Sequence, residues 1–417
     1  MLCQFRFKNF ASYRDETVFD MQATDIEEFR DSLIPPPGDK FSALLPISVI
    51  FGPNGGGKSN ALDALAAFIS HVMLPIATST NYRNPFGMYL AQYKPFLLDD
   101  NSKDTPTEFE LFFRTKTAQY QYELSLLAGT VVSESLSAVK TPCKRRRSAL
   151  LFERVGSQIE LGSALKRANA QNVSELIPYL SFLSINYSFP EIQDVIDWFK
   201  RCCIINFGVP DRDHRFYPFV NDPDIKPMLL AVLSDLDIPI SDYEIQEETD
   251  GSGETKHKLT TTHIVHERAF QLDINSESEG TVKLLSVLPG VIVSLVSGGF
   301  LLVDELDAKL HPRLLRYLIE LYTDPTLNTR HAQLVFTCND ISIMKNDLLR
   351  RDEIWFAARD DEGSSELWSL YDIQDVNGNR VKNTAAYDRQ YLAGRYGADP
   401  YLKPKTRLLI TQVLTWI

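Results

Sequence analysis

The sequence predicts an α/β fold in which a mixed β-sheet is combined with an antiparallel β subdomain and a helical insertion. Three observations support this fold class. A short apolar run over residues 44–51 leads into a glycine-rich loop and then into helical spacing. Apolar and polar residues alternate between positions 109 and 136, as antiparallel strands require. A second short apolar run, 300–303, ends in two adjacent carboxylates.

The composition is that of a globular protein. The chain has 417 residues, of which 44% are hydrophobic and 24% are charged, so it is long and apolar enough to bury a full core. Its 43 Lys+Arg against 55 Asp+Glu give a net charge of −12. This acidic balance argues against a protein that coats nucleic acid by bulk charge.

The five cysteines are scattered and include no Cys-x-x-Cys spacing, so neither a zinc site nor a disulfide framework is expected. The N-terminus does not have the pattern of a signal peptide. The longest apolar run, 287–303, is interrupted by proline, glycine and serine, which excludes a transmembrane helix there. We therefore expect a cytoplasmic protein without a membrane segment.

Taken in order, the first element is a strand in which Phe5 and Phe7 alternate with Arg6 and Lys8. A loop containing three prolines and a glycine follows at 35–38. The run 44–51 is typical of a strand buried on both faces, and 60–73 has helical spacing. Antiparallel strands with turns near residues 116 and 129 come next, and 150–161 predicts one more hairpin.

The pattern from about 163 to 242 is mainly helical and lacks heptads, so we expect a helical lobe rather than a coiled-coil arm. Later segments predict strands over 257–274, 300–303, 333–337 and 353–357, and helices over 281–295, 312–322 and from about 406. The expected organisation is a nucleotide-binding lobe with the antiparallel subdomain (1–162), a helical insertion (163–246), a second lobe (247–375) and a C-terminal extension (376–417).

Residues 52–59 read Gly-Pro-Asn-Gly-Gly-Gly-Lys-Ser and match the phosphate-loop pattern G-x-x-x-x-G-K-[ST] between a strand and a helix. Glycines let backbone N–H groups approach phosphate oxygens, and the helix N-terminus adds a positive potential. Lys58 would contact the β- and γ-phosphates, and Ser59 would bind Mg²⁺. A chance match in a glycine-rich turn is the alternative. The predicted ATP-binding residues here are Asn54, Gly55, Gly56, Gly57, Lys58, Ser59 and Asn60.

The acidic pair Asp304-Glu305 follows four apolar residues. A P-loop enzyme needs an acid at a strand end to hold Mg²⁺, which predicts that role for Asp304 together with Ser59. Glu305 would orient the attacking water. A strand ending in solvated acids is common, so the prediction depends on the phosphate loop, about 245 residues earlier. That separation argues against Ras-like and kinase-like folds.

The segment Asp304-Glu305-Leu306-Asp307 followed by Leu-His-Pro resembles the Walker B motif and D-loop of ABC-type ATPases, and among them the SMC and DNA-repair heads. The residues Ser-Glu-Gly-Thr at 278–281 occupy the place of the ABC signature. The resemblance implies an ABC-type head in which Ser278, Gly280 and Thr281 contact ATP on a partner subunit and Asp307 lies at the dimer seam. Taken alone, Ser278 would be a simple helix N-cap.

The chain more closely resembles the AAA-type ABC ATPase family of bacteria and archaea that includes RloA-like and AbiL-like proteins of abortive-infection and retron systems. The segments that carry this resemblance are 5–16, 52–60, 95–99, 278–281, 303–312 and 391–400. It implies a head that dimerises on ATP and Mg²⁺ as the sensor or regulator subunit of an antiphage defence system with a separate toxic effector. Alternatives are a DNA-binding repair or chromosome-associated ATPase, or an ATP-controlled scaffold with little turnover.

One departure concerns the switch histidine that this class usually places after the strand 333–337. Asn339 occupies that position, and an amide can hydrogen-bond a phosphate oxygen but cannot carry a positive charge. We therefore expect slow hydrolysis. The sequence does not fix the position of the Q-loop; Gln92, which precedes the segment 95–99, is one candidate for its glutamine.

Other candidate sites are weaker. The basic run Lys144, Arg145, Arg146 and Arg147 is either a solvated hairpin tip or a contact for DNA or RNA. His263 and His266 could bind a metal, but their spacing places them on opposite faces of a strand. After residue 340 no Asp-x-Asp follows, so an OLD-like nuclease module is not expected.

Overall fold

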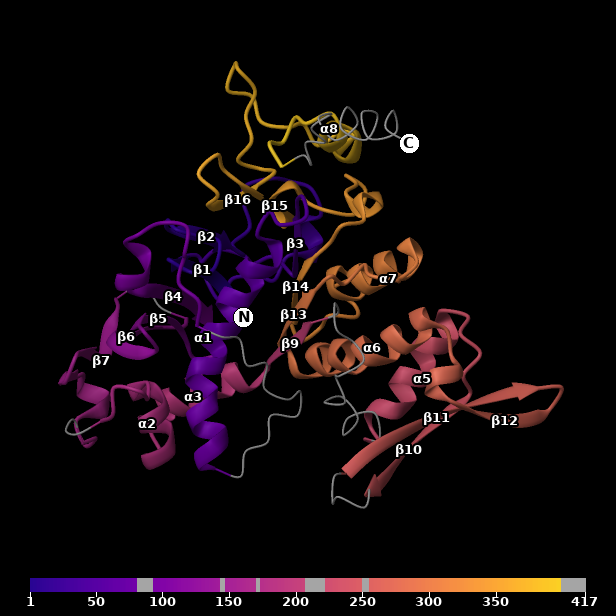
Figure 1. The fold of residues 1–417 in the computed structure, drawn as a ribbon, viewed down its shortest axis with the longest axis horizontal. Coiled ribbons are helices and arrows are strands. Elements are labelled where there is room, and N and C mark those ends of the chain that lie inside the picture. The colour runs from indigo at the N-terminus through magenta and orange to yellow at the C-terminus, as the bar shows by residue number, and fades with distance from the viewer. Residues whose placement is uncertain (81–92, 143–146, 170–172, 207–221, 250–254, 399–417) are drawn as a thin grey trace, which may run out of the picture.

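The computed structural model describes residues 1–80, 93–142, 147–169, 173–206, 222–249 and 255–398 (Figure 1). At its centre is a six-stranded sheet in the order β16-β15-β3-β14-β13-β9, in which only β16 runs antiparallel to its neighbour. The strands are β3 (Ile47–Phe51), β9 (Cys202–Asn206), β13 (Phe300–Asp304), β14 (Gln333–Thr337), β15 (Ile354–Arg359) and β16 (Ser365–Ser369). The predicted mixed sheet is confirmed.

A second, antiparallel sheet has seven strands in the order β2-β1-β4-β5-β6-β7-β8. They are β1 (Leu2–Lys8), β2 (Thr17–Asp20), β4 (Thr107–Arg114), β5 (Ala118–Leu127), β6 (Thr130–Lys140), β7 (Ala149–Val155) and β8 (Gln158–Leu161). The turns near residues 116 and 129 and the hairpin at 150–161 lie where the alternation predicted them. The antiparallel subdomain is confirmed.

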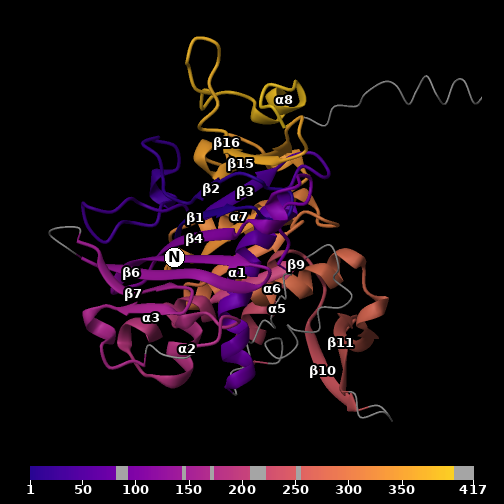
Figure 2. The same ribbon diagram turned by 60° about the vertical axis from the view of Figure 1, so that its left-hand side comes forward.

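Helix α1 (Lys58–Ser79) packs between the two sheets (Figures 1 and 2). Its Phe68 ring lies 5.9 Å from the ring of Phe5, 5.6 Å from that of Phe109 and 5.3 Å from that of Tyr122, all from the antiparallel sheet. The other face of the central sheet is covered by α6 (Glu279–Ser297) and α7 (Pro312–Thr323). The order of layers is therefore antiparallel sheet, α1, central sheet, α6 with α7.

The central strands are buried on both faces, as the apolar runs predicted. On β3, Ile50 packs in the core that contains α1, whereas Val49 packs in the core that contains α6 and α7. Leu302 and Val303 divide in the same way on β13. Because successive side chains of a strand point to opposite faces, a continuous apolar run satisfies both cores.

The predicted helical insertion over 163–246 requires a correction. Helices α2 (Tyr179–Asn186) and α3 (Pro190–Lys200) pack in the core of α1 and the antiparallel sheet, but β9 is the edge strand of the central sheet. Among the described helices of this segment, α5 (Ile225–Asp235) lies outside that core and packs on α6. A five-residue apolar run beside helical segments cannot be identified as a strand by periodicity alone.

A small three-stranded sheet extends from α5 at one end of the molecule (Figure 1). It consists of β10 (Asp242–Thr249), β11 (Thr255–Val265) and β12 (Arg268–Asp273) and confirms the alternation predicted over 257–274. Near the described C-terminal end, α8 (Tyr387–Leu392) packs against the core of the central sheet through Tyr387 and Tyr391. The short 3-10 helices in the described part of the chain are Arg30–Ser32, Ser102–Asp104, Ser163–Leu165, Ile274–Ser276, Ile341–Ile343 and Arg351–Glu353.

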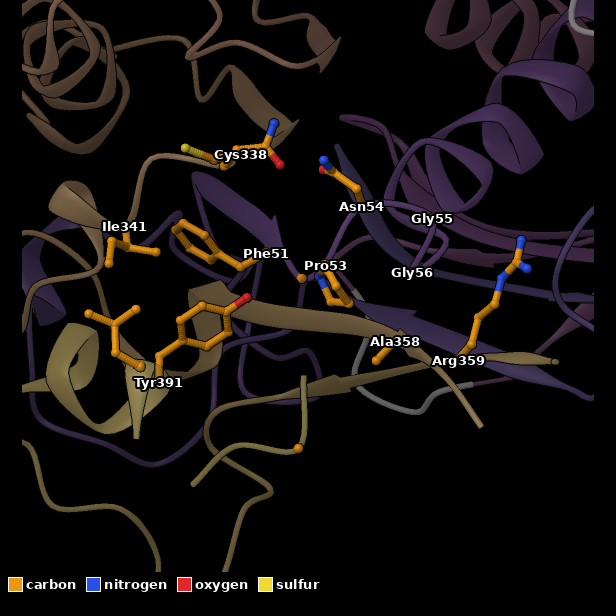
Figure 3. Close-up of a pocket in the computed structure, with 14 residues that line it drawn as sticks. Phe51, Pro53, Asn54, Gly55, Gly56, Cys338, Ile341, Ala358, Arg359 and Tyr391 are labelled. Atoms are coloured by element: carbon orange, nitrogen blue, oxygen red, sulfur yellow. The ribbon is translucent and has the colours of Figure 1, made fainter. Parts of the chain in front are cut away.

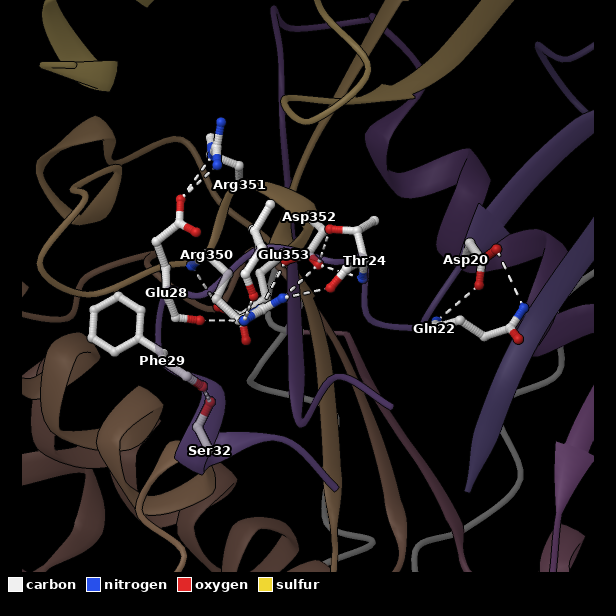
Figure 4. Close-up of polar contacts among 11 residues, drawn as sticks. Asp20, Gln22, Thr24, Glu28, Phe29, Ser32, Arg350, Arg351, Asp352 and Glu353 are labelled. Atoms are coloured by element: carbon white, nitrogen blue, oxygen red, sulfur yellow. Dashed lines mark hydrogen bonds and ion pairs between the residues drawn. The ribbon is translucent and has the colours of Figure 1, made fainter. Parts of the chain in front are cut away.

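A buried ionic network fixes the start of β15 to the segment that follows β2 (Figure 4). The Arg350 guanidinium donates to both carboxylate oxygens of Asp352 at 2.9 Å and to the carbonyl of Glu28. Asp352 in turn accepts from the Thr24 amide at 2.9 Å. Burial raises the pKa of the neighbouring Glu353 carboxyl to about 8. Removing one partner of such a buried network leaves an uncompensated charge, so the network holds β15 in a single position.

Among the described helices, α1 and α6 are long and apolar enough to cross a membrane by length and composition. About two thirds of the apolar window of α1 and over half of that of α6 are buried inside the protein. Their apolar residues form the two cores described above. Core packing is therefore sufficient to account for their composition.

Candidate functional site

The candidate site lies at the edge of the central sheet where β3, β14 and β13 end. These three strands are parallel neighbours, so their carboxyl ends meet at one edge. The phosphate loop follows β3, Thr337 ends β14 and Asp304 ends β13. In parallel α/β sheets this edge is where ligands bind.

The glycines of the phosphate loop are required by close packing and by backbone conformation. A Cβ atom at Gly52 would lie 2.0 Å from the carbonyl oxygen of Ala357, and one at Gly57 would lie 2.4 Å from Ser365 Oγ. Gly57 also has a φ of 109°, which side-chain-bearing residues rarely adopt. A Cβ at Gly55 would contact nothing within 4 Å, so this part of the loop is open. The loop is thus held on its inner side and open on its outer side.

Lys58 is the first residue of α1 and is buried under the loop. Its Nζ donates to the carbonyl oxygens of Gly52 at 2.8 Å and Pro53 at 3.2 Å. Burial lowers the pKa of Lys58, and the charges of Asp304 and Glu305 oppose that shift. The ammonium group is therefore enclosed by the loop that is expected to hold phosphates.

Ser59 and Asp304 are brought together although they are far apart in the sequence. Ser59 Oγ donates to Asp304 Oδ1 at 3.0 Å, and Thr337 Oγ1 donates to the same oxygen at 2.6 Å. Hydroxyl and carboxylate oxygens are the ligands that Mg²⁺ prefers, so this donor set suits that ion. The predicted pair of Mg²⁺ ligands therefore lies at the end of the phosphate loop.

Glu305 has a left-handed backbone conformation with a φ of 54°. Its amide donates to Thr337 Oγ1 at 2.6 Å, and the amide of Leu306 donates to the Thr337 carbonyl at 3.2 Å. A left-handed conformation at a residue with a side chain costs roughly 1–3 kcal/mol and persists only where the surroundings enforce it. Thr337 supplies that constraint for Glu305.

Asp307 binds the turn that contains Asn339. Its Oδ2 accepts from the amides of Asn339 and Asp340, both at 3.0 Å. Burial raises the pKa of Asp307, and those amide hydrogen bonds lower it. Asp307, which is predicted to lie at a dimer seam, therefore also binds the turn at the switch position of its own chain. The Asn339 side chain in that turn is exposed.

Ser278 is the N-cap of α6. Its Oγ accepts from the amide of Thr281 at 3.1 Å, so the N-cap interpretation of this residue is confirmed. A Cβ at Gly280 would lie 3.2 Å from the carbonyl oxygen of Lys309, just after the acidic pair. Ser278 and Glu279 are exposed, so the N-terminus of α6 lies at the surface.

A cavity of about 690 Å³ lies beside the phosphate loop (Figure 3). Asn54 and Gly55 line it on one side, Asn339 lines it from the end of β14, and Tyr391 of α8 lines it on the opposite side. Arg359, at the end of β15, also contributes. The structure thus places Asn339 next to the loop, as the sequence predicted for the switch position.

Several residues that support the loop were not predicted individually. Tyr13 OH donates to the carbonyl of Gly57 at 3.2 Å, and burial raises its pKa. Ser12 Oγ accepts from Asn60 Nδ2 and from Ser365 Oγ, both at 2.8 Å. The side chain of Asn60, which was predicted to bind ATP, is thus hydrogen-bonded within the chain in this structure. Ser12 and Tyr13 lie in the segment 5–16, which carries part of the family resemblance. That resemblance was the sequence signal that pointed to these two residues.

Some predicted residues lie outside the described part of the chain. These are Gln92, Lys144, Arg145, Arg146 and the helix from about 406. Arg147 is described and exposed. Within the described residues, no group of three or more His, Cys, Asp or Glu side chains could hold a metal ion. His263 Nε2 instead lies 2.7 Å from Glu277 Oε1.

The family described as "AAA domain, putative AbiEii toxin, Type IV TA system" matches residues 47–338. This range runs from the start of β3 to just past the end of β14, and it covers over two thirds of the chain. The chain belongs to this AAA-domain family. Both the family match and the geometry of the phosphate loop indicate nucleotide binding. The family resemblance found in the sequence is confirmed to that extent.

No curated protein matches the chain. Among solved structures, the SMC head domain from Thermotoga maritima is 13% identical, with 88% of this chain and 98% of that chain covered and a TM-score of 0.40. An SMC head bound to the C-terminal winged-helix domain of ScpA is also 13% identical, with coverages of 88% and 97% and a TM-score of 0.43. The SMC head from Pyrococcus furiosus is 12% identical, with coverages of 88% and 96% and a TM-score of 0.38.

Replacing Thr337 by valine should impair the acidic pair while preserving the shape of the side chain. The change leaves Asp304 Oδ1 without one donor and the Glu305 amide without its acceptor. Each lost partner costs about 1–3 kcal/mol, so we expect at least a tenfold lower rate of ATP hydrolysis and a higher Mg²⁺ requirement. Hydrolysis measured across a Mg²⁺ titration tests this.

Thr337→Ser is the matched control for this prediction, because it keeps the hydroxyl and should keep most of the wild-type rate. If the valine and serine variants have the same rate and the same Mg²⁺ midpoint, Thr337 does not position the acidic pair.

Proposed function

We propose that the chain is an ATPase of this AAA-domain family that binds ATP with Mg²⁺. The contact between Ser59, Asp304 and Thr337 carries the proposal, because it joins the phosphate loop to the acidic pair at the edge of one sheet. The loop amides of residues 54–57 and Lys58 would hold the phosphates. Mg²⁺, held by Ser59 and Asp304, would neutralise the charge that develops on them.

Glu305 would orient the attacking water and accept its proton. The site supports this because Glu305 follows Asp304 directly and its backbone is fixed by Thr337. Asn339 would donate a hydrogen bond to the γ-phosphate without adding charge. A neutral group stabilises the developing negative charge less than an imidazolium does, which agrees with slow turnover.

Two heads would close on two ATP molecules, with Ser278, Gly280 and Thr281 of one head contacting the γ-phosphate bound by the other. The exposed N-terminus of α6 supports this, because the N-terminal end of a helix carries a positive potential that favours anions. Asp307 would couple closure to the turn of Asn339, since it already binds both amides of that turn.

For the biological role, we infer a cytoplasmic sensor or regulator subunit of an antiphage defence system whose toxic effector is a separate protein. The support is the family description, which names a toxin–antitoxin system, and the earlier resemblance to abortive-infection ATPases. This inference rests on family membership and is independent of the site geometry.

The test uses the full chain with ATP and either Mg²⁺ or EDTA. We expect Mg²⁺-dependent release of phosphate and, by light scattering, a doubling of mass only with ATP and Mg²⁺. If neither nucleotide binding nor hydrolysis is detected, the proposed ATPase function is wrong. Binding and dimerisation without turnover would instead indicate the ATP-controlled scaffold.

A further inference from the structure

A second cavity, of about 790 Å³, lies at the opposite edge of the central sheet from the phosphate loop. It is reached at Phe300, where β13 begins, whereas the acidic pair lies where β13 ends. Five strand residues span about 13 Å, so the two sites are separate.

Three exposed cations line this cavity, namely Lys116, Arg201 and Arg330. Within the described part of the chain, none of the three forms an ion pair. In a chain with a net charge of −12, a local group of three cations without ion-pair partners among the described residues is unexpected.

The backbone brings two of these cations together. The turn Gly298-Gly299 precedes β13, and a Cβ at Gly298 would lie 2.4 Å from the carbonyl of Arg330, while one at Gly299 would lie 2.7 Å from that of Arg201. The Phe300 amide also donates to the Arg201 carbonyl at 3.1 Å. The two glycines therefore allow the segments before β9 and β14 to approach, and each segment contributes one arginine.

The turn that carries the third cation, Lys116, is held by Asp194, the one acidic residue among the described residues that line the cavity. Asp194 of α3 accepts through Oδ2 from the hydroxyls of Thr115 at 2.6 Å, Thr117 at 2.5 Å and Tyr120 at 3.0 Å. These three donors bind one carboxylate oxygen and fix the turn between β4 and β5, which carries Lys116. Asp194 thus positions Lys116 without pairing with it.

We propose that this cavity binds a phosphorylated ligand, through Lys116, Arg201 and Arg330. Guanidinium groups match phosphate oxygens in a bidentate geometry, and ammonium groups bind them as point charges. The phosphates could come from a free polyphosphate of nucleotide size, which a cavity of this volume admits, or from a nucleic-acid strand. The proposal does not depend on ATP hydrolysis at the phosphate loop.

The test compares two triple variants with the same change in charge. The first is Lys116→Glu with Arg201→Glu and Arg330→Glu. The second replaces three exposed cations elsewhere, Arg268, Lys382 and Arg389, by glutamate. Both variants keep the phosphate loop, so a difference between them reports the cavity alone. Two binding measurements are made on each variant, both with saturating Mg·ADP. Fluorescence anisotropy measures binding of a fluorescein-labelled single-stranded nucleic-acid 12-mer, and calorimetry measures binding of tripolyphosphate.

We expect the cavity variant to bind at least one probe about tenfold or more weakly than the variant altered elsewhere. If the affected probe is the 12-mer, the log–log salt slope should fall by about 2, near 0.7 for each lost phosphate contact. Loss of tripolyphosphate binding alone identifies a free polyphosphate as the ligand. The proposal is wrong if the two variants have equal affinities for both probes. An equal loss of affinity in both variants would reflect the change in bulk charge and would also overturn the proposal.

A set with glutamine at the same three positions removes the cations without adding negative charge. Thermal unfolding of every variant shows whether it is folded. If the glutamate set does not fold, the glutamine set replaces it in the same comparison, with the corresponding glutamine set elsewhere on the surface as control.

Discussion

The Glu305→Gln variant should hydrolyse ATP at least 100-fold more slowly than the wild type while still binding it. A positioned general base contributes about 10²–10⁴ to the rate, and glutamine keeps the size and hydrogen-bonding shape of glutamate but cannot accept the proton. The Thr337 hydroxyl holds the backbone amide of residue 305, not its side chain, so the local conformation should persist. Bound ATP should then accumulate together with the closed dimer.

Single-turnover hydrolysis and light scattering with ATP and Mg²⁺ measure the two effects of this variant. Glu175→Gln is the matched control, since Glu175 is exposed and lies outside the site. Hydrolysis by Glu305→Gln at the wild-type rate would show that another group orients the water. Slow hydrolysis by a variant that stays monomeric would support the catalytic role of Glu305 but refute the closed dimer.

The Lys58→Ala variant should lose ATP affinity rather than catalytic rate alone. Charge-assisted hydrogen bonds contribute about 1.5–3 kcal/mol each, so removing the ammonium that contacts the phosphates should weaken binding by about 10- to 150-fold. Burial lowers the pKa of Lys58, so enclosing its charged form costs free energy in the protein without nucleotide. The alanine variant should therefore remain folded.

Calorimetric titration with the non-hydrolysable analogue AMP-PNP and Mg²⁺ measures this affinity. Lys166→Ala, at an exposed position, is the control for the loss of one positive charge. Unchanged affinity of Lys58→Ala for the analogue would remove the phosphate loop from the proposed site, whatever the hydrolysis rate.

The local motifs were the most predictable part of this protein. The run 44–51, the glycine-rich loop and the helix after it form one continuous segment, and their predicted order is the order observed. The same holds for β13 and the carboxylates that follow it. Contacts within one strand–loop–helix unit depend on neighbouring residues, so spacing and residue type identify them.

The errors came from segments whose structure depends on distant partners. Cys202–Asn206 forms β9 because β13 is beside it, with Leu302 opposite Ile204, and nothing in its five residues demands an extended conformation. Thr337 lies at the end of a correctly predicted strand, yet its role depends on β13 being the neighbour of β14. The bond of Asp307 to the turn after β14 joins residues 32 positions apart, so local spacing could not indicate it.

The sequence by itself therefore determined which chemical groups end the central strands, namely the phosphate loop, the acidic pair and the neutral Asn339 of the switch position. Only the tertiary structure decided which groups meet. Insertion of β14 between β3 and β13 brings Thr337 onto Asp304 and Glu305, and the opposite ends of β9 and β14 gather Arg201 and Arg330. The physical reason is that strand order follows from burying both faces of the sheet in two cores, which no local spacing encodes.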